Sequence, residues 1–126
     1  MVKKRIEVDL GRQVLQAFQD NKAILTFECV SGDSSHPTDA GLFRIFRKHH
    51  PHWSHTYNVQ MNYAMFFTLD GKAIHQYHGF APLALIRTVK TGMTDLLGSH
   101  GCVRLKEEDA RTLYQWTPVG TFVHIK

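Results

Sequence analysis

Apolar and polar residues alternate along much of the N-terminal half of the chain, which is the pattern of strands with one buried face. Ile6, Val8 and Leu10 alternate with charged residues, and residues 13–19 repeat the alternation. Asp20-Asn21-Lys22 has the composition of a hairpin turn. Further strands are predicted over residues 23–30, 42–48, 65–69 and 72–75, with a loop rich in Ser, Gly, Asp and Pro over residues 31–40.

One segment near the C-terminus has helical character instead. Three carboxylates at residues 107–109 stand where they would complement the dipole of a helix N-terminus. Ala110, Leu113 and Tyr114 supply an apolar face, and Pro118 ends the helix. The pattern is weak over residues 76–98, which we interpret as a lid or substrate-facing insert with a short helical turn near residues 82–87. The chain is therefore expected to be mainly β, with one clear helix.

Composition narrows the class of protein. A length of 126 residues suits one hydrophobic core, so residues 1–126 are expected to form a single domain without a membrane span. The formal charge of +4 favours acidic partners, but the basic residues are scattered and form no nucleic-acid-binding motif. No apolar segment follows the basic N-terminus. The chain as it stands is thus expected in the cytoplasm, whereas a removed leader would place it in the periplasm or cell wall.

The reactive groups are concentrated in Ser99-His100-Gly101-Cys102-Val103-Arg104-Leu105. A cysteine attacks as the thiolate, so a nearby imidazole, cation or group of N–H dipoles has to lower its pKa. His100 and Arg104 flank Cys102 as candidates for this role. Gly101 permits backbone angles closed to other residues, so that consecutive N–H groups can converge on a developing oxyanion. The segment is predicted to hold a cysteine nucleophile.

The order Ser-His-Gly-Cys-Val-Arg-Leu, followed by an acidic helix start, resembles the signature of the L,D-transpeptidase catalytic domain, the YkuD family. Residues 37–45 resemble the family's Thr-Pro-x-Gly-x-Phe-x-Ile segment, with Gly41, Phe43 and Ile45 in register. Ala73-Ile74-His75 resembles its upstream histidine strand, and residues 118–125 resemble its last strand. The resemblance spans nearly the whole chain and implies a YkuD-like β-sandwich with one α-helix after the cysteine motif.

The same resemblance implies roles for individual residues. Cys102 would be the nucleophile, and His75 the base that takes its proton and later returns it to the leaving amine. The carbonyl of Gln76 would orient the His75 ring, and His100 would form a wall of the oxyanion pocket. His78 competes for the role of base, but the Ala-Ile lead-in to His75 better matches a strand end and favours His75.

Other residues near the motif are expected to support the site. Arg104 either contacts the substrate or holds the loop through a carboxylate pair. Ser99 can orient the loop by a hydrogen bond from its side chain to the backbone. Tyr57 and Tyr63 are candidates for a hydroxyl in the pocket. Lys106 stands where a small capping residue is common after the signature, which predicts a poorly capped helix.

A histidine-rich segment, His49-His50-Pro51-His52-Trp53-Ser54-His55, raises the question of a metal site. No second cluster of ligands is spaced to complete a tetrahedral site, so we predict an exposed loop bordering the substrate cleft, with no metal and no other cofactor. The second cysteine, Cys29, lies in a run of strand composition and is expected to be a buried, inert thiol.

Together, the residues and the resemblance predict a cysteine acyltransferase acting on peptidoglycan stem peptides, whose free carboxylates suit the positive charge. Cys102 would cleave the bond between the L-centre of a diamino acid and a terminal D-alanine, and pass the acyl group to an amine in cross-linking or D-amino-acid exchange. An L,D-carboxypeptidase would pass it to water, in cytoplasmic muropeptide recycling. Other classes are a non-catalytic peptidoglycan-binding module and a metal-binding protein based on the histidine-rich loop. Carbapenems are expected to acylate Cys102.

Overall fold

A computed structural model describes residues 3–32, 37–55, 58–78 and 101–126. Its elements, in chain order, are β1 (Lys4–Asp9), β2 (Val14–Gln19), β3 (Lys22–Glu28), β4 (Gly41–Arg44), β5 (Arg47–His49), β6 (Trp53–Ser54), β7 (Val59–Gln60), β8 (Ala64–Phe66), β9 (Ala73–Gln76), β10 (Val103–Leu105), α3 (Glu107–Trp116) and β11 (Phe122–Ile125).

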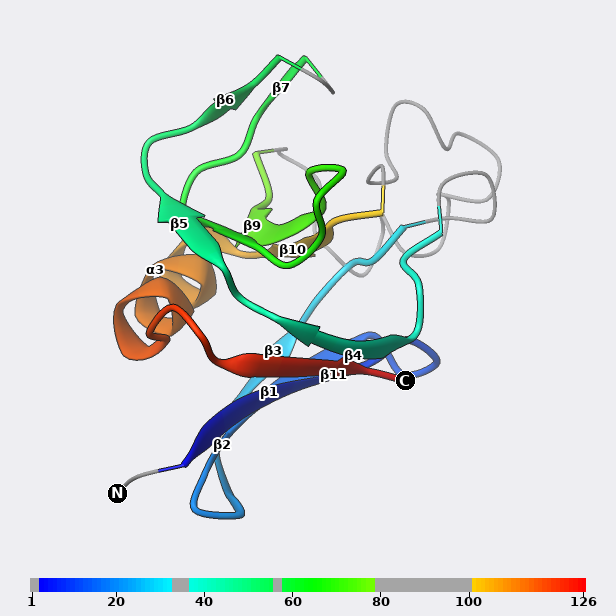
Figure 1. Cartoon of the computed structure of the whole chain (residues 1–126), viewed down its shortest axis with the longest axis vertical. Coiled ribbons are helices and arrows are strands. Elements are labelled where there is room, and N and C mark those ends of the chain that lie inside the picture. The colour runs from blue at the N-terminus through cyan, green and yellow to red at the C-terminus, as the bar shows by residue number, and fades with distance from the viewer. Residues whose placement is uncertain (1–2, 33–36, 56–57, 79–100) are drawn as a thin grey trace.

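The strands form two layers (Figure 1). A five-stranded sheet has the order β3-β2-β1-β11-β4, and a four-stranded sheet has the order β10-β9-β8-β5. The small hairpin β6-β7 stands beyond the four-stranded sheet, on the side away from the five-stranded one. The resulting β-sandwich confirms the mainly-β fold expected from the sequence.

The main core lies between the two sheets. Alternate residues of β1, β2 and β11 point into it from one layer, and Met65, Ile74, Val103 and Leu105 point into it from the other. This arrangement follows from the two-residue period of a strand, which sends successive side chains to opposite faces. The other face of the four-stranded sheet therefore carries a different set of side chains.

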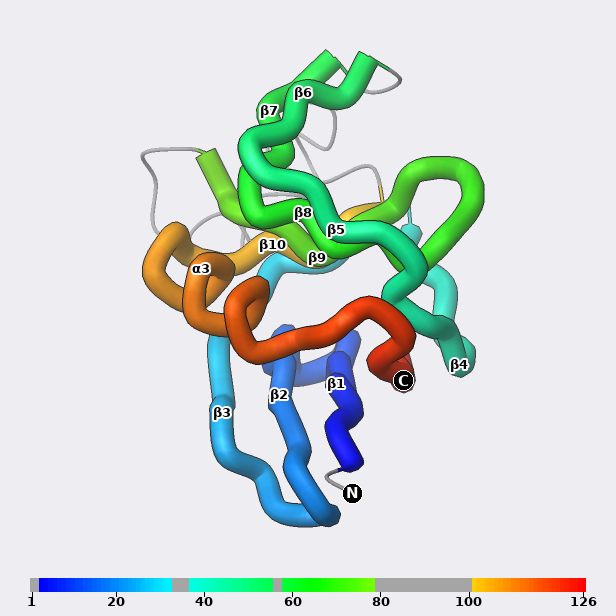
Figure 2. The backbone as a smooth tube through the Cα atoms, turned by 60° about the vertical axis from the view of Figure 1, so that its left-hand side comes forward, coloured from blue at the N-terminus to red at the C-terminus, as the bar shows by residue number. Residues whose placement is uncertain are grey.

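Helix α3 covers the flank of the sandwich between the layers (Figure 2). Ala110 and Leu113 are its buried residues, and its first turn carries three carboxylates, as predicted. Lys106 occupies the N-cap without a side-chain capping hydrogen bond, so the predicted poor cap is present. At the other end, Lys48 Nζ donates to the carbonyls of Tyr114 and Thr117 at 2.5 and 2.7 Å. A lysine from β5 thus satisfies carbonyls that the helix leaves unpaired.

The prediction of one strand over residues 42–48 was wrong. The chain pairs with β11 as β4, leaves the five-stranded sheet at Ile45 and Phe46, and pairs with β8 as β5 in the other sheet. Ile45 is buried where the chain crosses, and its N–H donates to the Thr121 carbonyl at 2.9 Å. Alternation continues through the crossing because Phe43 and Ile45 both face the core. The pattern of burial therefore could not reveal the change of sheet.

The predicted hairpins are confirmed. Asp20 and Asn21 both have positive φ, 51° and 68°, as a tight two-residue turn between β2 and β3 requires. Strands β8 and β9 pair antiparallel around Asp70-Gly71. Within the described residues, no helix is long and apolar enough to span a membrane.

Candidate active site

Two parallel strands bring the predicted nucleophile and base together. β9 pairs with β10 so that Ile74 lies opposite Val103, and His75 opposite Arg104. Ile74 and Val103 point into the core between the sheets. Neighbouring residues of a strand face opposite ways, so His75 and Arg104 lie on the outer face of the four-stranded sheet. Cys102 directly precedes β10, two residues before Arg104, and therefore lies on the same outer face.

Cys102 sits in an apolar cluster on this outer face. The cluster contains Met61, Ala64, Phe66 and Ala73, and only 2% of Cys102 is exposed. The Ala73 N–H donates to Sγ at 3.4 Å. That contact and the charges of Arg104 and Lys72 lower the pKa of the thiol, but burial outweighs them and raises it to about 11. In the resting site Cys102 is therefore a protonated thiol at neutral pH.

His75 is also buried, and its tautomer is fixed by the backbone. Its Nδ1 lies 2.8 Å from the Gln76 carbonyl oxygen. A carbonyl only accepts hydrogen bonds, so Nδ1 carries the proton and Nε2 has the lone pair. Burial lowers the pKa of His75 to about 3, with the charge of Arg104 acting in the same direction. His75 is therefore neutral and has the tautomer that a base acting through Nε2 requires.

The protonation states of this pair differ from those expected from the sequence. The cysteine motif suggested that neighbouring groups lower the pKa of the thiol, and the Arg104 charge does act in that direction. However, burial is the larger effect on both side chains. The site thus holds a neutral thiol and a neutral imidazole, an arrangement suited to proton transfer during attack rather than to a resting ion pair.

A neutral thiol predicts a characteristic pH dependence of alkylation. Below a pKa of about 11, the thiolate fraction of Cys102 rises tenfold with each pH unit. The rate of Cys102 alkylation by iodoacetamide is therefore expected to rise about 100-fold between pH 7 and pH 9. Intact mass against time at each pH measures it, with Cys102→Ala reporting alkylation of Cys29. A rate that is flat across this range would contradict alkylation through a thiol ionised to solvent.

Gly101 is held between two segments that are distant in sequence. Its φ of +96° lies in the region that glycine tolerates best. A Cβ at this position would lie 2.6 Å from Lys72 Cε and 3.1 Å from the Pro37 carbonyl oxygen. In addition, Thr38 Oγ1 donates to the Gly101 carbonyl at 2.8 Å. The backbone just before the cysteine is thus fixed by close packing and by a hydrogen bond.

Lys72 is itself held in place. Its Nζ lies 3.3 Å from Asp39 Oδ2 and 3.7 Å from Asp70 Oδ2, and only 16% of its side chain is exposed. No local motif in the sequence indicated a role for Thr38, Asp39 or Lys72. Residues 37–45 carried part of the family resemblance, which was the one signal available. Because these residues are far from Cys102 in sequence, local motif analysis could not connect them with it.

The remaining candidates have different surroundings. His78 is exposed, and its Nε2 accepts from the Asn62 N–H at 3.4 Å. The backbone of Arg104 bridges to Val30, and its guanidinium lies 5.3 Å from the centre of the Tyr77 ring. Tyr63 packs against the core between the sheets, stacked on His50, rather than in the cluster around Cys102. Ser99, His100, Tyr57 and the predicted insert from residue 79 onward lie outside the described residues.

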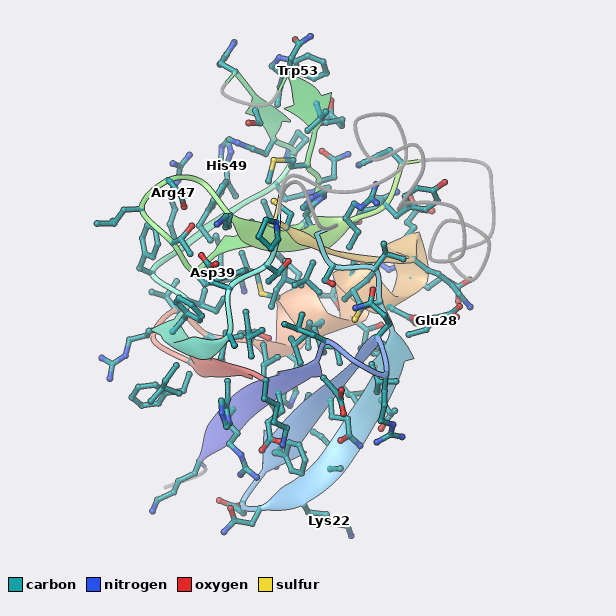
Figure 3. All side chains as sticks on the ribbon, turned by 90° about the vertical axis from the view of Figure 1, so that its right-hand side faces the viewer. Lys22, Glu28, Asp39, Arg47, His49 and Trp53 are labelled. Carbon is teal, nitrogen blue, oxygen red and sulfur yellow. The ribbon has the colours of Figure 1, made fainter. Side chains whose placement is uncertain are left out.

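The histidine-rich segment is more structured than the predicted exposed loop. Its residues 53–54 pair with residues 59–60 as the hairpin β6-β7, with Trp53 on the hairpin and His49 and Arg47 on β5 below it (Figure 3). His52 is partly buried and packs edge-on against Phe66, which belongs to the Cys102 cluster. Its Nδ1 lies 2.8 Å from His49 Nδ1. Across the described part of the chain, no group of three or more His, Cys, Asp or Glu is placed to hold a metal ion.

Cys29 is buried, as predicted, and it forms no disulfide with Cys102. It belongs to the core between the sheets, whereas Cys102 belongs to the cluster on the outer face. Both side chains are thiols, so Cys102 retains the sulfur atom that nucleophilic attack requires.

Comparison with known proteins agrees with this arrangement. A sequence model of the L,D-transpeptidase catalytic domain, YkuD, matches residues 3–125. No curated protein matches the chain. An L,D-transpeptidase from Stackebrandtia nassauensis is 29% identical with a TM-score of 0.82, over 98% of this chain and 55% of that one. The C442S mutant of the Enterococcus faecium L,D-transpeptidase is 27% identical with a TM-score of 0.83, over 98% and 50%.

A third solved structure, the L,D-transpeptidase LdtMt1 in complex with imipenem, is 18% identical with a TM-score of 0.77, over 99% of this chain and 59% of that one. At this identity the likeness concerns the fold. The chain thus spans between half and three fifths of the length of these three structures. Because the family match extends over residues 3–125, the chain belongs to the YkuD family of L,D-transpeptidase catalytic domains.

Proposed function

We propose that this domain is a cysteine acyltransferase that acts on peptidoglycan stem peptides as an L,D-transpeptidase. The observation that carries the proposal is the pairing of β9 with β10. It places a neutral His75, with Nε2 as its basic nitrogen, on the same sheet face as Cys102. The family match supports the substrate class. Cys102 is the proposed nucleophile and His75 the proposed base.

In the acylation step, Cys102 Sγ attacks the carbonyl between the L-centre of the diamino acid and the terminal D-alanine. His75 Nε2 takes the thiol proton as the S–C bond forms. The C–N bond then breaks, and His75 returns the proton to the leaving amine of D-alanine. The product is a thioester on Cys102, and the net charge of the Cys102–His75 pair is unchanged.

In the second step an amine attacks the thioester. His75 accepts the proton of that amine, the C–S bond breaks, and the proton returns to Cys102. The product is a cross-link when the amine belongs to a second stem peptide, and an exchanged terminus when it belongs to a D-amino acid. Water as acceptor gives L,D-carboxypeptidase activity with the same residues. The identity of the acceptor therefore decides between the two activities.

Negative charge develops on the carbonyl oxygen in both steps. We assign the backbone N–H of Cys102 to this oxyanion, because the turn at Gly101, with its φ of +96°, lies directly before that N–H in the chain. His100 is proposed as a wall of the oxyanion pocket and Ser99 as a support of the loop. Arg104 is proposed either to contact the substrate or to hold the loop. Gln76 supports the site by accepting from His75 Nδ1.

Product analysis tests the proposed function directly. A purified disaccharide-tetrapeptide is incubated with the protein, with and without excess glycine or a D-amino acid. The masses of the products are then measured by mass spectrometry. We expect an exchanged residue or a cross-linked dimer, absent with Cys102→Ala. Loss of terminal alanine alone would show an L,D-carboxypeptidase. No change with any substrate would leave the domain as a peptidoglycan-binding module.

Carbapenems are proposed as covalent inhibitors, since a carbapenem presents a strained amide to the same nucleophile. A solved relative in complex with imipenem supports this proposal. Exposure to imipenem is expected to increase the intact mass by one molecule of inhibitor, because the ring opens on attack and no atoms leave at first. Cys102→Ala is expected to keep its original mass. An unmodified wild-type protein would contradict an active nucleophile at Cys102.

A further inference from the structure

Thr38 connects the segment before β4 with the catalytic cysteine. Its hydroxyl is buried, accepts from the Gly32 N–H at 2.8 Å and donates to the Gly101 carbonyl at 2.8 Å. One hydroxyl can donate only one hydrogen bond. That donor is used on the Gly101 carbonyl, across 63 residues of sequence.

The carbonyl of Gly101 and the N–H of Cys102 belong to the same peptide unit. That unit is planar, and in the trans form its C=O and N–H bonds point in opposite directions. A hydrogen bond that fixes the Gly101 carbonyl therefore also fixes the direction of the Cys102 N–H. Thr38 lies on the carbonyl side, so the N–H is aimed away from Thr38.

The described residues before and after Thr38 are themselves anchored. Gln13 Oε1 accepts from the Ser31 N–H at 3.0 Å, and Val30 pairs with Arg104 on β10. Next to it, the Nζ of Lys72 is paired with Asp39, while the carbon atoms of Lys72 approach Gly101. Thr38 thus donates to the Gly101 carbonyl, while Lys72 packs against the glycine itself.

We propose that Thr38 is a positioning residue for acyl transfer, because its hydrogen bond to the Gly101 carbonyl aims the Cys102 N–H at the oxyanion of the tetrahedral intermediate. This role rests on the proposed use of Cys102 as a nucleophile. Thr38 touches neither the sulfur nor the substrate in this role. Its contribution is to hold a donor in the orientation that the charge requires, without reorganisation during the reaction.

Two reactions of the same thiol separate this role from a general structural one. Acylation by p-nitrophenyl acetate forms an S–C bond through an oxyanion, releases p-nitrophenolate, and transfers the thiol proton to His75. Alkylation by iodoacetamide forms an S–C bond and releases iodide and a proton, with no oxyanion. Both probes are small, so neither requires recognition of a stem peptide. Of the two reactions, only acylation depends on the orientation of the Cys102 N–H.

The test compares Thr38→Val and Thr38→Ala with Thr38→Ser in the full chain at one pH, with Cys102→Ala as the background. The first two variants are expected to lower the acylation rate 10- to 100-fold and to change the alkylation rate by less than threefold. Thr38→Ser, which retains the hydroxyl, is expected to acylate within about threefold of the wild type. Thermal unfolding identifies any variant that is not folded at the assay temperature. If either Thr38→Val or Thr38→Ala is unfolded, the remaining one of these two variants decides the proposal.

Equal losses in both reactions would overturn the positioning role, as would undiminished acylation in the two variants without the hydroxyl. Absence of wild-type acylation by the ester would overturn it too. The proposed function fails separately, when the wild type reacts with the ester but leaves the disaccharide-tetrapeptide unchanged. In that case the loss of acylation in Thr38→Val would still support the role of Thr38.

Discussion

Replacing His75 by asparagine is expected to lower kcat/KM for the disaccharide-tetrapeptide by about 10²- to 10⁴-fold, the usual contribution of a general base. Asparagine is chosen because its side-chain N–H can replace the donor that Nδ1 provides to the Gln76 carbonyl. It has no basic nitrogen in place of Nε2. The variant therefore removes the base while preserving the hydrogen bond that positions the side chain.

The matching substitution His78→Asn decides between the two histidines. His78 is exposed, whereas His75 is buried beside β10. We expect His78→Asn to keep more than a tenth of the wild-type kcat/KM. A severe loss in His78→Asn with an active His75→Asn would reverse the assignment of the base.

The pH profile of the wild type gives a second readout for His75. Its neutral form is the active one, and its pKa is lowered to about 3, so activity is lost only as the pH falls toward that value. We expect kcat/KM at pH 5 to be within about threefold of its value at pH 7. The activity that depends on a histidine with the ordinary pKa of about 6.5 would fall roughly 25-fold from pH 7 to pH 5. A profile of that kind would contradict the neutral, buried imidazole.

Gly101→Ala is expected to have the second large effect, on both stability and activity. A residue with a Cβ at a φ of +96° costs about 1–2 kcal/mol in backbone strain. The added Cβ would also lie 2.6 Å from Lys72 Cε, so Lys72 or the glycine backbone has to move. Because this backbone carries the Cys102 N–H, we expect acylation of Cys102 to fall about 10²-fold or more.

Gly120→Ala is the matched control. Gly120 has a similar φ of +101°, but no atom lies within 4 Å of the position of its Cβ. It should lose comparable stability from backbone strain and keep wild-type acylation, measured by thermal unfolding and by intact mass after imipenem. Lys72→Ala combined with Gly101→Ala should recover part of the lost acylation, since it removes the closest clash. Equal acylation in the two glycine variants would show that the contact with Lys72 does not matter.

Much of the fold follows from the sequence because buried positions recur as a regular pattern of apolar and polar residues. Ile6 and Val8 alternate with charged residues and face the core as β1, and the acidic start at Glu107 marks the first turn of α3. The change of sheet between β4 and β5 does not interrupt this pattern, so the sequence did not predict it. It depends on which strands are available to pair, namely β11 on one side and β8 on the other.

The sequence by itself determined which reactive groups the proposed site contains, because Cys102, Gly101 and Arg104 are neighbours in one short motif, and the family resemblance pointed to His75. Only the tertiary structure decided the protonation states of Cys102 and His75. Both depend on burial, and Cys102 is buried in a cluster that includes Phe66 and Met61, which are distant from it in sequence. Likewise, the contact between Thr38 and Gly101 exists only once the sandwich has formed. A motif records which groups are present, whereas pKa values and orientations are set by contacts between residues distant in sequence.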